Sequence, residues 1–188
     1  MSTTNKILWG EGLFLRPQHF QLQDQFHENR LSDVARTVHP YYWGVRTLKF
    51  DTVALANGQL RVEALSLIFP DGGIYDAPAT DVPPDALNLS AMPESAESCT
   101  IYLAISPLKE YGENSVDSDA KNGQVVRYIR RHAERPDLFT KAIPAEVTTL
   151  ESWVRLLPDT ESRDQFVTLP IARIRRSGTG GYQLDNDF

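Results

Sequence analysis

The pattern of hydrophobic and polar positions changes once along this chain, close to residue 40. Between Pro17 and Val38 there is no glycine and no second proline, and glutamine is frequent. Proline suits the first turn of a helix, and the pair His39-Pro40 ends one, because the residue before a proline is disfavoured in the α region. The pattern therefore predicts one long helix of about 20 residues, which would be about 30 Å long.

The apolar residues of this helix fall on two faces. At 100° per residue, five of them lie within about 40° of one line, and we expect this stripe to face the core. Leu22 and Phe26 point to roughly the opposite side, so the helix either lies between two layers or contacts a partner. Burial of these two residues under a loop of the same domain is the competing interpretation. The stripe consists of Phe20, His27, Leu31, Val34 and Val38.

Beyond residue 40 the apolar residues recur with a period of two, which is typical of strands. The first run covers residues 41–50, and residues 51–56 are compatible with a helical turn. The run at 59–69 changes phase in its middle, so we expect a β-bulge near Ala64. The remaining strands are expected at 74–76, 99–106, 125–133, 145–151, 153–157, 166–176 and 182–184.

The stretches between these strands differ in composition. Residues 78–98 carry four prolines and predict an extended surface crossover without regular structure. Residues 107–124 are polar and predict a loop, and the glycine-rich residues 178–181 predict a hairpin turn. By contrast, residues 99–106 are nearly all apolar, so this strand is expected to be buried on both faces.

The order of the elements indicates the fold class. One helix is followed by roughly eight strands, and the alternation of strands and helices of a doubly wound sheet is missing. We therefore predict a mainly β protein, an antiparallel β-sandwich with one N-terminal α-helix packed outside it or across one end. The length favours a single domain over residues 1–188, with the N-terminal segment and helix at about 6–38 and the sandwich at about 41–188.

Composition narrows the class of protein. The chain has 188 residues, 41% of them hydrophobic, and a net charge of −6. A single cysteine excludes a fold built on internal disulfides. No run approaches the roughly 20 apolar residues that span a bilayer, and only two apolar residues precede Trp9, so we expect neither membrane insertion nor a secretory signal. The expected compartment is the cytoplasm, and the acidity argues against nucleic acid as the main partner.

The sequence offers no catalytic or metal-binding constellation. Of the four histidines only His19 and His27 share an element, where they would lie about 80° apart around the helix and about 12 Å apart along it, too far to ligate one metal together. Cys99 opens an apolar strand, where a thiol is usually inert. Asp117 and Asp119 fall in the polar loop, which would not hold their carboxylates in the fixed positions that acid–base catalysis needs. We therefore predict no catalytic residue, no cofactor and no metal.

Two other readings remain open at this stage. Two arginine clusters on strands could form a patch for nucleic acid, although a solvated strand face balanced by acids is the more ordinary explanation. Three tryptophans could line a sugar- or receptor-binding surface of the sandwich. The clusters are Arg127/Arg130/Arg131/Arg135 and Arg173/Arg175/Arg176, and the tryptophans are Trp9, Trp43 and Trp153.

The string Trp9–Gln21, WGEGLFLRPQHFQ, is unusual. It closely resembles the N-terminal signature of the TssK family, baseplate components of bacterial type VI secretion systems. The segments at 40–46, 69–72 and 169–174 are similar to that family as well, in the same order. The resemblance covers essentially the whole chain.

The resemblance implies a structural adaptor with no catalytic step. Family members are more than twice as long, so the chain would be their N-terminal shoulder, a β-sandwich similar to the shoulder of phage receptor-binding proteins, without the helical neck and the head. The N-terminal side of the family binds the wedge proteins TssF and TssG, with TssE reached indirectly. The head engages TssL and TssM of the membrane complex. The whole protein is implied to be a cytoplasmic trimer at the inner-membrane-docked baseplate, and the isolated domain a monomer or weak oligomer.

The N-terminal motif and the second helix face form the candidate interface. The motif residues either lock the first segment onto the helix or contact a partner directly. Leu22 departs from the family, which often has glutamine there, and it adds an apolar side chain beside a glutamine-rich, uncharged surface. The candidate residues are Trp9, Glu11, Gly12, Phe14, Arg16, Pro17, Gln18, His19, Phe20, Gln21, Leu22 and Phe26.

Overall fold

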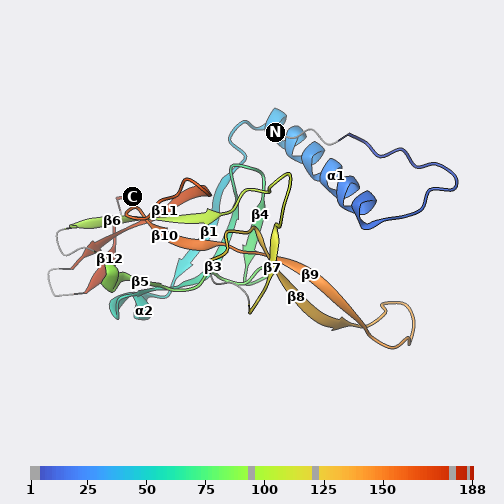
Figure 1. Ribbon diagram of the computed structural model, residues 1–188. Helices are drawn as coiled ribbons and strands as arrows, with labels where there is room; N and C mark the ends of the chain where they lie inside the picture. Colours follow the sequence, from blue (N-terminus) through green and yellow to red (C-terminus); the bar gives the residue numbers. More distant parts are fainter. Residues whose placement is uncertain (1–4, 93–95, 120–122, 178–180, 186) are drawn as a thin grey trace. The chain divides into compact units, whose positions relative to one another are not determined.

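The computed structural model describes residues 5–92, 96–119, 123–177, 181–185 and 187–188. The chain divides into two compact units, Met1–Tyr42 and Trp43–Phe188, and each is described here by itself (Figure 1). The predicted hairpin turn at 178–181 falls mostly on residues outside the described part. Ser177 and Gly181, which flank it, are joined by a backbone hydrogen bond of 2.8 Å.

The first unit consists of an extended segment and the helix α1, Pro17–Val38. Pro17 occupies the first turn, and Arg16 before it has extended backbone angles. At the other end the backbone N–H of His39 donates to the carbonyl of Ala35, 2.8 Å away. The helix predicted from the proline positions is confirmed with these bounds.

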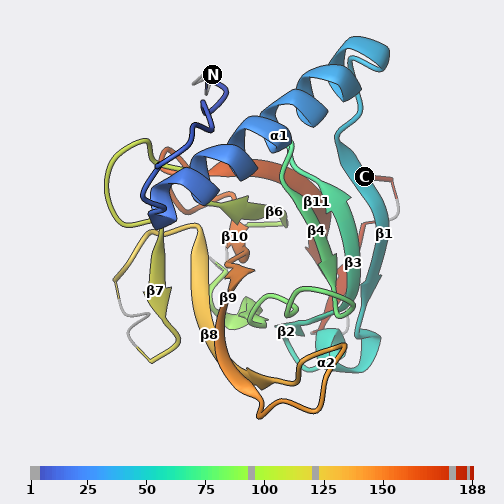
Figure 2. The ribbon, with the colours of Figure 1, turned by 90° about the vertical axis from the view of Figure 1, so that its right-hand side faces the viewer.

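The second unit is built from four sheets. Every strand pairing in them is antiparallel except that of β7 with β8, so the mainly β, largely antiparallel class is confirmed. In spatial order the sheets are β1-β3-β4, β10-β6-β11-β12, β2-β5 and β7-β8-β9 (Figure 2). The strands are β1 Gly44–Phe50, β2 Gln59–Leu60, β3 Val62–Ile68, β4 Ile74–Ala77, β5 Leu87–Asn88, β6 Ser98–Ile105, β7 Ser115–Asp117, β8 Tyr128–Arg135, β9 Ala145–Ser152, β10 Arg155–Pro158, β11 Val167–Arg176 and β12 Tyr182–Leu184.

One hydrophobic core fills the space between the first two of these sheets. Residues from β3 and β4 on one side meet residues from β6, β10 and β11 on the other. The short helix α2, Thr52–Ala56, adds Leu55, and Asp51 caps its first turn by accepting hydrogen bonds from two backbone N–H groups at 2.9 Å. The most completely buried side chains are Tyr75, Phe69, Leu60, Leu65, Leu67, Leu89, Ile101, Leu103, Ile105 and Ile174.

The phase change predicted near Ala64 is confirmed. Lys49 pairs with Ala64 but Phe50 pairs with Val62, so the residue between them on β3 has no partner in the ladder. Val62 and Leu65 are therefore both buried although they are three residues apart. The single strand predicted at 59–69 is split into β2 and β3. Between the two strands, the carbonyl of Arg61 accepts a hydrogen bond from the backbone N–H of Asp51.

The structure corrects two predictions of irregular backbone. The proline-rich stretch contains β5 and a 3-10 turn, Leu89–Ala91, and it buries Leu89 and Met92 in the core. The polar stretch 107–124 contains β7, which is held by parallel pairing with β8. Both strands exist only through pairing with another strand, β5 with β2 and β7 with β8, and the local pattern did not reveal these pairings. The expected burial of β6 on both faces holds for its last residues and not for Thr100 and Tyr102.

A buried ion pair joins three segments at one end of the core. Arg127 Nη1 lies 2.7 Å from Asp71 Oδ2 and donates to the carbonyl of Ser106 at 3.0 Å. Only 9% of the Arg127 side chain is exposed, against 29% for Asp71. Burial works against the charge on Arg127, but the Asp71 carboxylate outweighs it and raises the Arg127 pKa. We call this arrangement the Arg127 clamp.

Candidate partner-binding site

The N-terminal motif forms a turn that leads into α1. The backbone N–H of Leu13 donates to the carbonyl of Gly10 at 3.3 Å. Gly12 has a φ of +80°, a left-handed conformation that is strained for residues with a Cβ. The glycine of the motif is therefore required by the backbone at this point.

The first turn of α1 is closed by a reciprocal pair between Arg16 and His19. The backbone N–H of His19 donates to the Arg16 carbonyl, and the backbone N–H of Arg16 donates to His19 Nδ1, both at 3.0 Å. The imidazole thus takes the position that Glu or Gln occupies in a capping box. This contact needs His19 Nδ1 without a proton. His19 accordingly has an architectural role in this unit.

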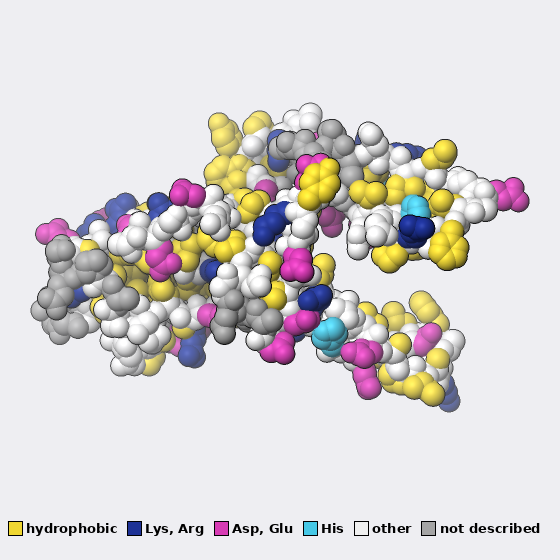
Figure 3. Space-filling model, viewed as in Figure 1, with side chains coloured by type: hydrophobic (Ala, Val, Ile, Leu, Met, Phe, Trp, Pro, Cys, Tyr) yellow, Lys and Arg dark blue, Asp and Glu magenta, His cyan; other side chains and the backbone are white. Residues whose placement is uncertain are grey.

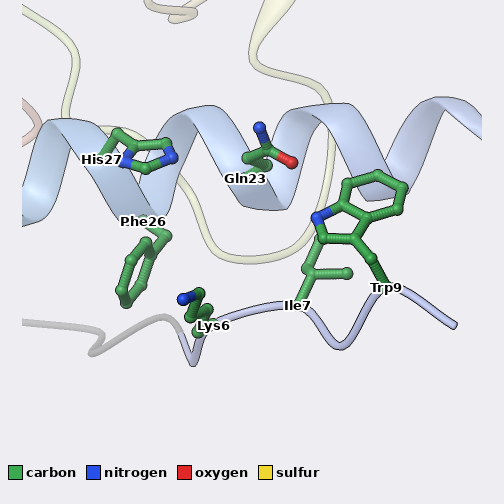
Figure 4. A pocket seen from close by; sticks show the side chains of 6 residues that line it. All are labelled: Lys6, Ile7, Trp9, Gln23, Phe26 and His27. Carbon is green, nitrogen blue, oxygen red and sulfur yellow. The ribbon is translucent and has the colours of Figure 1, made fainter.

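The segment before the turn folds back along the helix. The Trp9 ring lies 6.2 Å from the His19 ring and 6.4 Å from the Phe20 ring, measured between centroids. A shallow hollow remains between segment and helix, and Figure 4 shows Phe26 pointing toward the segment from the helix side. The hollow is lined by Lys6, Ile7, Trp9, Gln23, Phe26 and His27.

The two anchors predicted on the second helix face differ in their surroundings. Leu22 is 43% exposed. Phe26 is half-buried, and its ring makes an edge contact with His27 at 5.5 Å and lies 5.8 Å from the guanidinium of Arg30. The chain's own first segment therefore occupies part of the apolar face that includes Phe26. Leu22 is the clearer candidate for a partner.

The stripe predicted to face the core is not covered within its own unit. No residue of α1 is buried, and all five stripe residues are exposed. At the end of the helix Tyr42 turns back, with its hydroxyl 2.9 Å from Ser32 Oγ and 3.3 Å from Arg36 Nη2. The unit is thus held by the first segment along one face of the helix and by Tyr42 near its end, and the predicted stripe stays exposed.

The motif residues fall into two groups. Trp9, Arg16, His19 and Phe20 are brought together at the start of the helix, as described above. Gly12 and Pro17 also have local roles, in the turn and in the first turn of α1. The remaining motif residues are exposed and carry the part of the interface prediction that local architecture does not explain. They are Glu11, Phe14, Gln18, Gln21 and Leu22.

Five of the seven arginines in the two clusters pair with carboxylates within the described part of the chain. Arg127 is held in its clamp, and Arg130 and Arg131 pair with Asp117 and Glu151 at 2.9 and 2.7 Å. On β11 the arginines share one acid, with Arg175 Nη2 lying 2.7 Å and Arg173 Nη1 lying 3.6 Å from Asp185 Oδ2. The ordinary explanation of a charge-balanced strand face agrees with this geometry. The indole of Trp153 is covered on one side by the Arg155 guanidinium, 3.9 Å from the ring centroid.

The loop between β8 and β9 carries exposed apolar residues that the sequence reasoning passed over. Leu138, Phe139 and Ile143 all lie in it. The sequence signal that could have revealed them is a Leu-Phe pair shortly after Pro136. The pair lies between two predicted strands and belongs to the apolar pattern of neither strand.

Chemically reactive groups are few in the part of the chain that the structure describes. Among those residues no cluster of three or more His, Cys, Asp or Glu could hold a metal ion. Cys99 is buried, and this burial raises the pKa of its thiol to about 11. In the described ranges no helix has both the length and the apolar character needed to cross a membrane.

These features define a β-rich module whose N-terminal helix and β8–β9 loop expose apolar side chains. A family model described as "Bacterial Type VI secretion, VC_A0110, EvfL, ImpJ, VasE" matches residues 19–188, so the chain belongs to this family of bacterial type VI secretion proteins. It is 30% identical over its whole length to the type VI secretion system baseplate component TssK1 of Pseudomonas aeruginosa. The resemblance to the TssK family is confirmed. The chain spans 42% of the length of that relative.

Solved structures agree with this relation. A chain of a TssK-TssF-TssG baseplate subcomplex, determined by cryo-electron microscopy, matches 98% of this chain with a TM-score of 0.89 and 27% identity, and the match covers 61% of that chain. A chain of a type VI secretion baseplate complex matches the same share at a TM-score of 0.87 and 26% identity, over 41% of its own length. A crystal structure of TssK, 24% identical, has the same fold with a TM-score of 0.84, over 97% of this chain and 41% of that one.

Proposed function

We propose that this chain is the N-terminal adaptor domain of a type VI secretion baseplate protein and that it binds the wedge proteins TssF and TssG. The observation that carries the proposal is the match of 98% of the chain, at a TM-score of 0.89, to a chain of a TssK-TssF-TssG subcomplex. The role is structural, with no catalytic step. It rests on surfaces that are complementary to those of a partner.

The exposed side of α1 supports this role physically. Leu22 offers an apolar anchor, and Gln18, Gln21 and Gln25 beside it are uncharged. Amide side chains lose less free energy than charged groups when they leave water, and they can exchange hydrogen bonds with a partner's backbone. Because the contacts of the first segment and of Tyr42 order this unit, less conformational entropy would be lost on binding.

The experiment is co-purification with TssF and TssG of the same secretion system. Wild-type chain should co-purify with the two proteins, and Leu22→Asp should reduce the recovered complex strongly. Leu31→Asp is the matched control, since it places the same change at an exposed leucine on another face of the helix. Phe26→Asp is added to Leu22→Asp only in a second step, because Phe26 also packs on the chain's own segment.

The outcomes separate the site from the function. Equal recovery of the wild type and Leu22→Asp would reject this helix face as the contact. Failure of a folded wild-type chain to associate with TssF and TssG at all would reject the adaptor function. Circular dichroism of each variant establishes that the chain is still folded.

The whole protein would link the baseplate to the membrane complex. The match covers 42% of the relative, so more than half of that protein lies outside it. We assign to that remainder the neck that forms the trimer and the contacts with TssL and TssM. These contacts would keep the assembly docked at the inner membrane. Full-length protein should therefore co-purify with TssL and TssM, and this chain alone should not. Recovery of TssL or TssM with this chain would refute the assignment.

A further inference from the structure

The strands β8 and β9 form a ribbon that extends away from the other sheets of its unit (Figure 1). At its base the ribbon is three strands wide, because β7 pairs with residues 128–130 of β8. From Arg131 to Arg135 the described residues give β8 only one neighbour, β9. A two-stranded ribbon is marginally stable in water on its own, so a feature of this length needs another reason to be ordered.

The loop at the end of this ribbon, residues 136–144, is mostly apolar. Leu138, Phe139 and Ile143 are 86%, 95% and 91% exposed, and Figure 3 shows hydrophobic side chains gathered over the outer end of the ribbon. We call these three residues the ribbon tip. Their exposed area is on the order of 500 Å², within the roughly 300–600 Å² of the largest apolar patch on a typical monomer, which is often functional.

Hydrogen bonds from side chains to the backbone order the tip. The Asp137 carboxylate accepts from the N–H groups of Phe139 and Thr140, both at 2.8 Å, and these bonds lower the Asp137 pKa. Thr140 Oγ1 accepts from the N–H of Ala142 at 3.2 Å. A turn fixed in this way presents Leu138 and Phe139 in one conformation, which reduces the entropy lost when they are bound.

The base of the ribbon is also fixed. The carbonyl of Arg127, whose side chain forms the clamp, accepts from the N–H of Trp153 at 2.8 Å, directly below the first pair of the ribbon. Higher up, Arg131 pairs with Glu151 across the two strands. The ribbon thus has a defined direction relative to the core of its unit. A fixed support reduces the conformational entropy that is lost when the side chains at its end are bound.

The charge of the ribbon indicates the kind of partner. Residues 128–152 carry four basic side chains, Arg130, Arg131, Arg135 and Lys141, and four acidic ones, so their net charge is zero. The acidic ones are Glu134, Asp137, Glu146 and Glu151. Nucleic acid and anionic lipid both attract basic surfaces, which this ribbon does not offer. An uncharged, concave protein surface is the complementary partner.

We propose that the ribbon tip is an anchor that inserts into an apolar, uncharged pocket of the TssF–TssG wedge complex. The proposal rests on the adaptor function and adds to it a second contact, separate from the face of α1. The tip supplies more than half of the roughly 800 Å² that each partner buries in an interface of standard size, so it needs only a modest polar rim around it.

The test measures binding of the whole chain to immobilised, purified TssF–TssG complex. The double variant Leu138→Ser/Phe139→Ser removes the anchors, and Tyr111→Ser is the control, because Tyr111 is an aromatic residue of similar exposure in a different loop. We expect the dissociation constant to rise about tenfold or more for the double variant and to stay within about twofold for the control. Thermal unfolding should be unchanged in both, since the substituted side chains are exposed.

Each possible result supports or refutes the ribbon-tip proposal. Wild-type binding that the double variant retains in full overturns the anchor and leaves the adaptor function standing. Absence of wild-type binding overturns both. Two further measurements cover the other occupants, namely sedimentation with vesicles of phosphatidylcholine and phosphatidylglycerol, and light scattering of the chain alone. If the double variant loses vesicle binding or self-association while it keeps its affinity for TssF–TssG, the proposal is wrong.

Discussion

Replacement of Asp71 by Asn should destabilise the fold through the Arg127 clamp. The amide keeps an oxygen for the N–H of Gly73, which Asp71 Oδ1 now accepts at 3.0 Å, so the turn itself is preserved. What is lost is the negative charge beside a guanidinium that is only 9% exposed, together with the hydrogen bond that Oδ2 accepts from Arg127 Nη1, because an amide NH2 in that place cannot accept it. The variant therefore measures the cost of a buried cation that has lost its charged acceptor.

The magnitude follows from the burial of the two partners. Removal of one partner of a fully buried pair costs about 3–5 kcal/mol. Asp71 is 29% exposed, so water moderates the loss, and the Ser106 carbonyl still accepts from Arg127. We expect the free energy of unfolding to fall by about 2 kcal/mol, which for a chain of this size lowers the melting temperature by about 4–8 °C.

Urea unfolding followed by circular dichroism measures this change, with Glu151→Gln as the control. The Arg131–Glu151 pair has the same N···O distance of 2.7 Å but lies nearer the surface, with 41% and 24% of the side chains exposed. Exposed pairs contribute at most about 1 kcal/mol. If Asp71→Asn costs no more than Glu151→Gln, burial is not what gives the clamp its strength, and the reasoning is refuted.

Three further outcomes follow from the structure. Since the pKa of Cys99 is raised from 9.0 to about 11, its alkylation at pH 8 should be about 100-fold slower in the folded chain than in urea, and equal rates would contradict the burial of the thiol. Because the thiol ionises first in the unfolded chain, the free energy of unfolding should fall as pH rises from about 9 to about 11. Gly73→Ala should cost about 1–3 kcal/mol in the same urea assay, because a Cβ there collides with the Arg127 guanidinium, and an unchanged midpoint would mean that the clamp can shift. Light scattering at micromolar concentration should show a monomer or weak oligomer, and a stable trimer would show that the rest of the protein is not needed for assembly.

The elements that sequence could predict are those whose signals are local. The helix has proline at its start and His39-Pro40 at its end, so its bounds needed no tertiary information. The bulge in β3 was visible as a change of phase. In contrast, β7 owes its existence to parallel pairing with β8, and β8 begins at Tyr128 instead of Val125, with Val126 and Arg127 buried before it.

The candidate site was predictable only in part, for a related physical reason. The N-terminal motif stood out as a string, but composition could not show that His19 would accept from the Arg16 backbone or that Trp9 would pack beside it. The ribbon tip was missed because an apolar residue in a loop has no period to follow. Exposure of Phe139 becomes visible only once the ends of both strands are known.

The Arg127 clamp and the ribbon tip together predict a coupling that neither predicts alone. If the clamp sets the direction of the ribbon, Asp71→Asn should weaken binding to TssF–TssG by a few-fold in addition to lowering stability. In a chain that already carries Leu138→Ser/Phe139→Ser, the direction of the ribbon no longer matters, so Asp71→Asn should then change the affinity little. The two effects should therefore be non-additive in a double-mutant cycle of dissociation constants, while their effects on unfolding add. Full additivity in binding would mean that the clamp stabilises the core without positioning the anchor.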